Sequence, residues 1–355
     1  MSGSSLDGLD LVYAHLHETG GKWSYEIIAA ECYAYPSEWI SRLQGSVHLP
    51  AGDYLLLHTE YGHYIGGQVN KFIEAYDLHH KVHLVASHGH TSFHLPGKRM
   101  TAQLGDGAAI AAATCLPVVS DLRAMDIAFG GQGAPIVPIG QKLLFPEYDL
   151  FLNIGGIANI SCKKDGSYTA FDVCPANRVL NILVEERNMQ YDEDGKIAAS
   201  GQINTTLLDK LNDLEYYKQL HPKSLSNTFG TDIILPIIHQ QNISLEDSLR
   251  TYVEHIVLQI KQAIVNSTFN IQHSTLFITG GGALNAFLVS RLQEQLAALN
   301  VEVILPEKNI IHYKEALIMA LIGILRWREE DNVLAEATGA SRSSIGGALW
   351  LGMEA

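Results

Sequence analysis

Residues 149–161 read DLFLNIGGIANIS, and this stretch decides the fold prediction. The pattern predicts an apolar strand over 149–154, a Gly155-Gly156 turn and a second strand over 157–161. A polar turn at 164–166 and a third strand over 168–173 follow, after which the pattern becomes helical. Strands joined by glycine turns and then covered by helices are typical of α/β domains.

The first half of the chain shows a similar succession of glycine turn, strands and helix. A glycine-flanked turn, GSSLDG at 3–8, precedes a strand over 9–17 and an extended segment over 25–33, and three-to-four apolar spacing predicts a helix over 55–73. Later, a strand over 274–279 opens into three glycines with a helix behind them. The repetition predicts two similarly built α/β lobes with a central ligand cleft. We expect an N-terminal lobe at 1–140, a C-terminal lobe at 141–355, and a last helix, 313–328, that packs back across the lobes.

Composition restricts the partners. The 355 residues carry a net charge of −14, with 24 basic and 38 acidic side chains, which disfavours a nucleic-acid or anionic-membrane surface. The four cysteines have no metal or disulfide spacing, and the six histidines between 79 and 94 contain no HExxH pattern, so we expect no metal-ligating residues. We find no apolar run of about 20 residues and no signal-peptide pattern, and therefore expect a cytoplasmic protein with a small-molecule partner.

Three glycine-rich turns lie at strand ends, at 3–8, 155–156 and 280–282. Glycine lets the backbone approach a ligand closely, and neighbouring Ser hydroxyls add hydrogen-bond donors. A single turn of this kind is more typical of plain chain reversal, but three in two half-chains indicate phosphate binding. The sequence contains neither a P-loop nor a useful dinucleotide fingerprint, so another nucleotide-binding architecture is indicated.

That architecture is suggested by a series of ordered motifs. GSSLDGLD at 3–10 resembles the G-[TS]-S-x-D-G-x-D turn of the anhydro-N-acetylmuramic acid kinases, and SHGHT at 87–91 resembles their S-H-G-Q-T. Further counterparts follow in order: DLR at 121–123, GGQGAP at 130–135, NIGGIAN at 153–159, FD at 171–172, ASG at 199–201, PKS at 222–224, GGGALN at 280–285 and TGA at 338–340. The chain is identified as a member of this family, which implies the duplicated ribonuclease H-like/actin-like ATPase fold.

The resemblance also implies the chemistry. The family uses ATP and Mg²⁺ to open the 1,6-anhydro ring of anhydro-N-acetylmuramic acid with water and to phosphorylate the released 6-oxygen, giving N-acetylmuramic acid 6-phosphate in peptidoglycan recycling. Asp172 matches the general base. The matching ATP and phosphate positions are Gly3, Ser4, Ser5, Leu6, Asp7, Gly8, Leu9, Asp10, Gly155, Gly156, Gly280, Gly281, Gly282 and Asn285. The sugar candidates are Ser87, His88, Thr91, Asp121, Arg123 and Glu315, and a homodimer is a further expectation.

The residues taken alone leave alternatives open. Asp172 could equally be a turn or cap aspartate before a helix at 175–183, His88 a surface histidine, Arg123 a solvated ion-pair partner, and Glu315 the N-terminal charge of the helix at 313–328. The chain could also be another carbohydrate kinase of the same fold, or a nucleotide-binding module without catalysis.

The chain departs from the family pattern in several places. FDVCPAN at 171–177 replaces F-D-x-G-P-G-N, so Cys174 and Ala176 stand where glycines are usual, and we expect a stiffer backbone there. His90 replaces Gln and Ser4 replaces Thr. Relatives carry an apolar strand before the first turn, so we expect either an earlier start of the reading frame or a sheet that tolerates the loss. We also expect hinges near 135–146 and at the start of the helix at 313–328, since those segments connect rather than pack.

Overall fold

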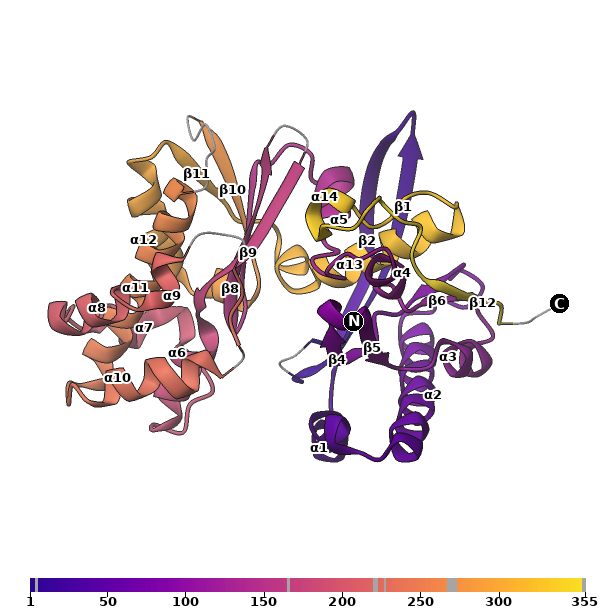
Figure 1. The fold of residues 1–355 in the computed structure, drawn as a ribbon, viewed down its shortest axis with the longest axis horizontal. Coiled ribbons are helices and arrows are strands. Elements are labelled where there is room, and N and C mark those ends of the chain that lie inside the picture. The colour runs from indigo at the N-terminus through magenta and orange to yellow at the C-terminus, as the bar shows by residue number, and fades with distance from the viewer. Residues whose placement is uncertain (4–5, 165–166, 220–222, 227, 267–272, 353–355) are drawn as a thin grey trace. The chain divides into compact units, whose positions relative to one another are not determined.

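The computed structural model describes residues 1–352 except 4–5, 165–166, 220–222, 227 and 267–272 (Figure 1). The chain forms two compact units, of which unit 1 combines Met1–Pro146 with Tyr313–Ala355 and unit 2 is Glu147–His312. The structure thus groups residues 313–355 with the N-terminal part of the chain, whereas the boundaries expected from the sequence assign them to the C-terminal lobe. No helix in the described part of the chain is long and apolar enough to span a membrane.

Unit 2 is built on a five-stranded sheet of order β11-β10-β7-β8-β9. The three predicted strands are present as β7 (Leu150–Ile154), β8 (Ile157–Lys164) and β9 (Ser167–Pro175), and they pair as antiparallel neighbours. β10 (Ser274–Thr279) pairs in parallel with β7, and β11 (Val301–Ile304) pairs in parallel with β10. Three antiparallel strands extended by parallel strands on the side of the first one form the ribonuclease H-like arrangement, so the predicted α/β fold class is confirmed.

Helices cover this sheet. They are α6 (Asn177–Glu185), α7 (Lys196–Ser200), α8 (Thr205–Asn212), α9 (Glu215–Lys218), α10 (Leu235–His239), α11 (Leu245–Asn266) and α12 (Ala286–Ala297), with short turns η3 (Glu193–Gly195), η4 (Gly230–Ile234) and η5 (Gly281–Leu284). Leu152 and Ile154 of β7 share one buried core with Tyr252 and Ile256 of α11.

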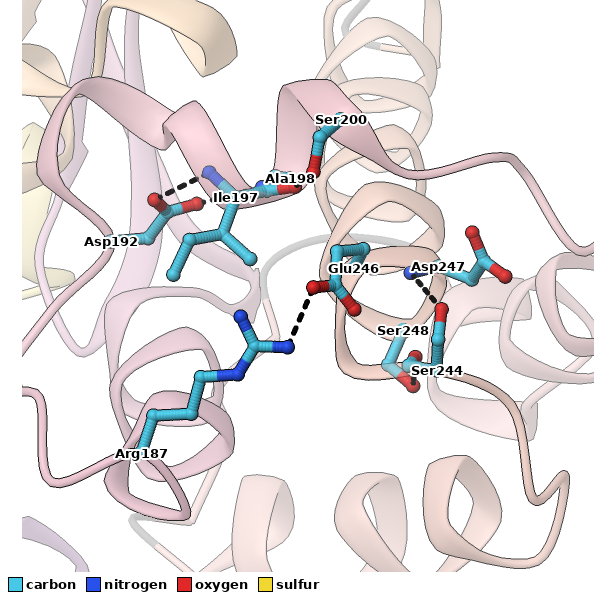
Figure 2. Close-up of polar contacts among 9 residues, drawn as sticks. All are labelled: Arg187, Asp192, Ile197, Ala198, Ser200, Ser244, Glu246, Asp247 and Ser248. Carbon is cyan, nitrogen blue, oxygen red and sulfur yellow. Dashed lines mark hydrogen bonds and ion pairs between the residues drawn. The ribbon is translucent and has the colours of Figure 1, made fainter.

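The ASG stretch at 199–201 lies at the end of α7, where this helix packs against α11, and Figure 2 shows Ser200 and the polar contacts around it. Asp192 accepts hydrogen bonds of 2.9 Å from two backbone N–H groups of α7 and so caps that helix. Arg187 forms an ion pair of 2.6 Å with Glu246 at the start of α11. A Cβ atom on Gly201 would lie 2.1 Å from the carbonyl oxygen of Glu246. This motif therefore packs α7 against α11.

The described residues of unit 1 form three small sheets. β1 (Gly8–Thr19) and β2 (Lys22–Ala34) form an antiparallel hairpin, and β4 (His90–Leu95) and β5 (Met100–Leu104) form another. The third sheet has the order β12-β6-β3, in which β3 (Val85–Ala86) is parallel and β12 (Ala348–Trp350) antiparallel to β6 (Val118–Ser120). The opening strand-strand-helix order is confirmed.

The helices of unit 1 are α1 (Ser37–Gly45), α2 (Ala51–Ala75), α3 (Gly107–Thr114), α4 (Ala124–Ala128), α5 (Pro138–Leu144) and α14 (Ala335–Thr338), with α13 (Lys308–Trp327) entering it at Tyr313 and short turns η1 (Ser46–His48) and η2 (Pro96–Lys98). The expectation that residues 135–146 connect rather than pack is wrong. Pro138, Ile139 and Leu144 are buried, and a Cβ atom on Gly140 would lie 2.4 Å from Ile318 of α13.

Candidate active site

Asp172 lies on β9 beside a β-bulge. The register shifts between Ala158 and Asn159, so that Asp172 pairs with Asn159 while Cys174 pairs with Ala158 and Val173 is the extra residue. A bulge re-aims the side chains next to it and is frequent beside active sites. The bulge therefore gives the Asp172 carboxylate a direction that regular strand alternation does not predict.

A loop holds Asp172 in place. The backbone N–H of Leu225 donates to Oδ2 of Asp172 at 2.9 Å, and the backbone N–H of Asp172 donates to the carbonyl of Lys223 at 3.1 Å. The Tyr216 hydroxyl donates to the Asp172 carbonyl at 2.6 Å. The second carboxylate oxygen, Oδ1, accepts none of these three bonds. The cap alternative is wrong, because α6 begins at Asn177, its N-cap residue is Ala176 and no side chain caps it.

Electrostatics favour Asp172 as a proton acceptor. Burial raises the pKa of the half-buried Asp172 carboxyl, and the Leu225 N–H opposes this rise only in part. A carboxylate with a raised pKa accepts a proton more readily. The environment thus suits general-base chemistry.

Lys223 belongs to the PKS motif, to which we assigned no role from the sequence. Its Nζ donates to the carbonyl of Tyr216 at 3.0 Å and lies 4.4 Å from the centre of the Tyr216 ring. Burial lowers the pKa of Lys223. Since Tyr216 also binds the Asp172 backbone, Lys223 and Tyr216 form one cluster with Asp172. Pro222 of the same motif lies outside the described residues.

The Gly155-Gly156 turn joins β7 to β8 and accepts the start of α6. The carbonyl of Gly156 accepts from the N–H of Ala176 at 2.8 Å, and that of Gly155 accepts from the N–H of Asn177 at 3.1 Å. Gly156 is exposed, neither glycine has a positive φ, and a Cβ atom on Gly156 would meet only the Cβ of Arg178, at 3.7 Å. The fold therefore leaves room for a side chain here, which is consistent with glycine serving the approach of a ligand.

The Gly280–Gly282 turn lies beside this one, because β10 and β7 are parallel neighbours that end together. Asn177 links the two turns: its Nδ2 donates to the carbonyl of Ile154 at 3.1 Å, and its Oδ1 would lie 3.1 Å from a Cβ atom on Gly282. Gly280 has φ +82°, and a Cβ atom on Gly282 would lie 2.2 Å from Ile154. These two glycines are required by the fold, whatever ligand the turn binds. Sequence reasoning had not singled out Asn177.

Asn285 has a structural role. Its Oδ1 accepts from the N–H of Leu288 at 3.0 Å and caps α12. Because its side chain caps the helix, only its backbone is available to a ligand at the neighbouring Gly280–Gly282 turn.

The first turn is described at Gly3 and from Leu6 to Gly8, while Ser4 and Ser5 lie outside the described residues. The side chains of Leu6 and Leu9 are buried in the core of unit 1, so only their backbone could serve a phosphate. A Cβ atom on Gly8 would lie 2.5 Å from Sγ of Cys32, so this glycine is required by strand packing. The exposed Asp7 carboxylate accepts from the N–H of Gly8 at 3.1 Å.

His88 and Arg123 are in direct contact. Nε of Arg123 donates to Nε2 of His88 at 2.9 Å, and the opposite ring nitrogen of His88 lies 3.0 Å from the carbonyl of Gly89, to which it donates. Burial, followed by the Arg123 charge, lowers the pKa of His88 to about 3, so the ring is neutral at neutral pH. The alternative of a surface histidine is wrong, because His88 is buried.

Arg123 also connects to the GGQGAP stretch. Its Nη1 donates to the carbonyl of Gly133 at 2.6 Å, while the Gly133 N–H donates to the buried Asp126 carboxylate at 2.7 Å. Thr338 of the TGA motif donates to the same carboxylate at 2.6 Å. Burial lowers the pKa of Arg123 to about 10, whereas Glu315 and Asp126 favour its charged form. Asp126, which sequence reasoning missed, thus ties two distant motifs to the arginine.

The other sugar candidates lie around this pair in unit 1. Ser87 is buried, Asp121 has φ +54° and accepts from the Ser120 hydroxyl at 3.1 Å, and Thr91 is exposed on β4. Glu315 is half-buried, and its negative charge favours the charged form of Arg123. Burial raises the pKa of Asp10, and the charges of Asp7 and Glu315 raise it further. Because α13 begins at Lys308, Glu315 does not lie in its first turn and is not an N-terminal helix charge.

A ribonuclease H-like sheet with glycine turns at its strand ends and a half-buried aspartate on its edge strand is the arrangement of the sugar-kinase and actin class of ATP-binding proteins. The model of one family, anhydro-N-acetylmuramic acid kinase, matches residues 1–352. The anhydro-N-acetylmuramic acid kinase of Francisella tularensis subsp. novicida (strain U112) is 33% identical over 98% of this chain and 97% of its own length. That of Vibrio vulnificus (strain CMCP6) is 31% identical over 99% of this chain and 96% of its own.

The chain therefore belongs to the anhydro-N-acetylmuramic acid kinase family, as the ordered motifs predicted. It is a kinase, a transferase of amino-sugar metabolism in cell-wall recycling. A solved structure of the activator of 2-hydroxyisocaproyl-CoA dehydratase from Clostridium difficile with bound ADPNP aligns with a TM-score of 0.40 at 15% identity, over 90% of this chain and 96% of that one.

Proposed function

We propose that this chain opens the 1,6-anhydro ring of anhydro-N-acetylmuramic acid with water and transfers the γ-phosphoryl group of ATP to the 6-oxygen. The observation that carries the proposal is the half-buried Asp172 with its raised pKa, set beside a β-bulge and held by one N–H donor on Oδ2. An ordinary sugar kinase needs to deprotonate a sugar hydroxyl, whereas this reaction needs to deprotonate a water, and both need such a base.

In the proposed reaction, Asp172 takes a proton from the water that attacks the anomeric carbon. The bond between that carbon and the bridging oxygen breaks, and the bridging oxygen becomes O6, which accepts the phosphoryl group as ADP leaves. The hydrogen bonds from Leu225 and Tyr216 fix the strand segment that carries the carboxylate. Lys223 places a positive charge in the same cluster. The proposed reaction involves negatively charged groups throughout, namely the phosphates of ATP and the oxygen released from the ring.

ATP fits the glycine turns of unit 2. Gly155 and Gly156 offer backbone without a side chain at the carboxyl end of β7, next to the Gly280–Gly282 turn at the end of β10. Among the described residues, no group of three or more His, Cys, Asp or Glu side chains could hold a metal ion. Mg²⁺ usually binds through substrate phosphates, waters and one or two carboxylates, so a single exposed carboxylate such as Asp7 is sufficient for it. An ion held there would supply positive charge against the phosphates.

The sugar fits the His88–Arg123 pair of unit 1. Anhydro-N-acetylmuramic acid carries a lactyl carboxylate, and a guanidinium can bind a carboxylate through two parallel hydrogen bonds. Nε and Nη1 of Arg123 already donate to His88 and Gly133, which holds the guanidinium plane in one orientation. We further propose that the protein acts in the cytoplasm and as a homodimer.

Product analysis tests the proposal. The chain is incubated with ATP and, separately, with anhydro-N-acetylmuramic acid, N-acetylmuramic acid and N-acetylglucosamine, and the products are separated and weighed by mass spectrometry. We expect the first sugar to gain both a water and a phosphoryl group. Phosphorylation of the open-ring sugars alone would indicate an ordinary carbohydrate kinase, and ATP binding with no product would indicate a module without catalysis.

The pH dependence should follow the raised pKa of Asp172. A general base works only when it is unprotonated, so kcat/KM should fall as the pH drops through this pKa, and the acidic limb should lie above the ordinary range of an aspartate. A pH profile of kcat/KM for the sugar, at saturating ATP, measures this limb. The residual activity of Asp172→Asn should lack it. An acidic limb at or below the ordinary aspartate range would contradict the assignment.

A further inference from the structure

The carboxylate of Asp126 on α4 is buried, with 1% of the residue exposed. Its Oδ2 accepts from the N–H of Gly133 at 2.7 Å, and its Oδ1 accepts from the hydroxyl of Thr338 at 2.6 Å. A Cβ atom on Gly131 would lie 2.3 Å from Oδ2, so the backbone of this loop passes directly beside the carboxylate. Because a buried carboxylate is costly unless donors satisfy its oxygens, these bonds fix Gly133 and Thr338 relative to each other.

The segment at 338–341 holds the same loop through its backbone. The N–H of Gln132 donates to the carbonyl of Thr338 at 2.8 Å, and the N–H of Ser341 donates to the carbonyl of Phe129 at 3.1 Å. The Thr338 side chain is buried, so water does not compete for its hydrogen bond to Asp126. These bonds thus connect the loop at 129–133 to a segment that lies far away in the sequence.

Gly133 transmits this arrangement to Arg123. Its N–H donates to Asp126, while its carbonyl accepts from Nη1 of Arg123 at 2.6 Å. Nε of Arg123 donates to His88 at 2.9 Å, and the two bonds of Arg123 define the plane of its guanidinium. A guanidinium has five N–H donors in one rigid fork, and Nη2 donates in neither bond. Nη1 and Nη2 can therefore bind a carboxylate together, provided that Gly133 keeps the plane in this orientation.

We propose that Asp126 and Thr338 are positioning residues that set the preference for an acidic sugar. They fix the Gly133 carbonyl, and this carbonyl fixes the Arg123 guanidinium in the plane that a carboxylate needs. The inference rests on the proposed function, in which Arg123 binds the lactyl carboxylate of the sugar. Asp126 and Thr338 are both buried, so they act through Gly133 and not by contact with the sugar. Their loss weakens binding of the acidic sugar and spares a sugar without the lactyl group, because only the acid uses the guanidinium plane.

Thr338→Val tests the positioning role, because it replaces the hydroxyl that donates to Asp126 by a methyl group of similar size. We expect the KM of anhydro-N-acetylmuramic acid to rise roughly tenfold, with kcat and the KM of ATP within about twofold. The inhibition constant of 1,6-anhydro-N-acetylglucosamine, which has no lactyl group, should not change. Thr338→Ser keeps the donor and should restore the KM. Ser344→Ala is the matched control and should leave these constants unchanged, because the buried Ser344 hydroxyl has no hydrogen-bond partner in the described part of the chain.

Asp126→Asn is the second variant and should raise the same KM, because its amide nitrogen faces a donor in place of an acceptor oxygen. Arg123→Lys keeps the charge but loses the fork, and so tests the sugar contact separately. An unchanged KM of the acidic sugar in Arg123→Lys would contradict that contact itself. A raised KM there, with an unchanged KM in Thr338→Val and Asp126→Asn, would overturn the positioning role alone. Equal weakening of the acidic and the neutral sugar, or a loss of kcat with a lower Tm and no change in KM, would make Asp126 and Thr338 structural residues and would also overturn it.

Discussion

Asp172→Asn is expected to lower kcat by about 10²–10⁴-fold while leaving the fold and ATP binding intact. The amide has nearly the shape of the carboxylate, and its oxygen can still accept the Leu225 N–H that now reaches Oδ2 at 2.9 Å. It cannot take a proton from water. Steady-state kcat with both substrates saturating measures the loss, and a separate ATP titration shows that the nucleotide still binds.

Asp192→Asn is the matched control for this substitution. Asp192 is also an aspartate of unit 2 that accepts backbone N–H bonds, but it caps α7 (Figure 2). Asparagine keeps only one of the two oxygens that accept the N–H groups of Ile197 and Ala198, so the substitution should cost about 1–3 kcal/mol of stability and leave turnover near that of the unsubstituted chain. If Asp172→Asn behaved like Asp192→Asn, Asp172 would be a structural residue and the proposed base would have to be sought elsewhere.

Gly156→Val is expected to lower kcat/KM for ATP by about 100-fold, with a much smaller effect on the KM of the sugar. Gly156 is exposed, its φ is not positive, and the nearest atom to a new Cβ is 3.7 Å away, so the fold itself accepts a side chain. A branched side chain would stand where the proposal places phosphate. Separate titrations of the two substrates, together with the Tm, measure the effect.

Gly282→Ala is the comparison that distinguishes a glycine needed for packing from a glycine needed for the approach of a ligand. Its Cβ would lie 2.2 Å from a methyl group of the buried Ile154, and overpacking of this kind costs about 1–3 kcal/mol. The alanine variant should therefore lose thermal stability, whereas Gly156→Val should keep it. A Gly156→Val protein with a lowered Tm and equal weakening of both substrates would make Gly156 a chain-reversal residue.

The first three strands of unit 2 could be predicted from the sequence because their signals are local, whereas the order of the strands in the sheet could not. The apolar run at 150–154, the Gly-Gly turn and the alternation after it each lie within a few residues, and β7 and β8 follow them. The same holds for α2, whose apolar spacing is continuous. The motif match then located Asp172 and the three turns by position.

Other features depend on contacts between distant residues. No local pattern indicates that Gly8 and Gly282 are needed for packing while Gly156 is not, since this depends on Cys32 and Ile154. The bulge beside Asp172 depends on the register of β8 against β9. The link from Thr338 to Asp126 spans 212 residues. For these features, sequence position identified the residue but not its role.

The two lost glycines of the 171–177 motif have a structural explanation. Cys174 lies within β9 and is fully buried, as a small apolar residue in a strand can be. Ala176 has φ −131°, outside the left-handed region that favours glycine. Neither position requires glycine in this chain, so the Asp172 segment keeps its hydrogen bonds to Leu225 and Tyr216.

The position of a solvent oxygen in the product tests the central claim most directly. The reaction is run in ¹⁸O-labelled water with ATP and anhydro-N-acetylmuramic acid, the sugar phosphate is reduced at once with borohydride to fix its anomeric oxygen, and fragment masses are recorded. Water attack at the anomeric carbon with Asp172 as base predicts one ¹⁸O at C1, none in the C6–O–P linkage, and no labelled product from Asp172→Asn within the same time. Label at O6, or labelled product formed equally fast by Asp172→Asn, would contradict it.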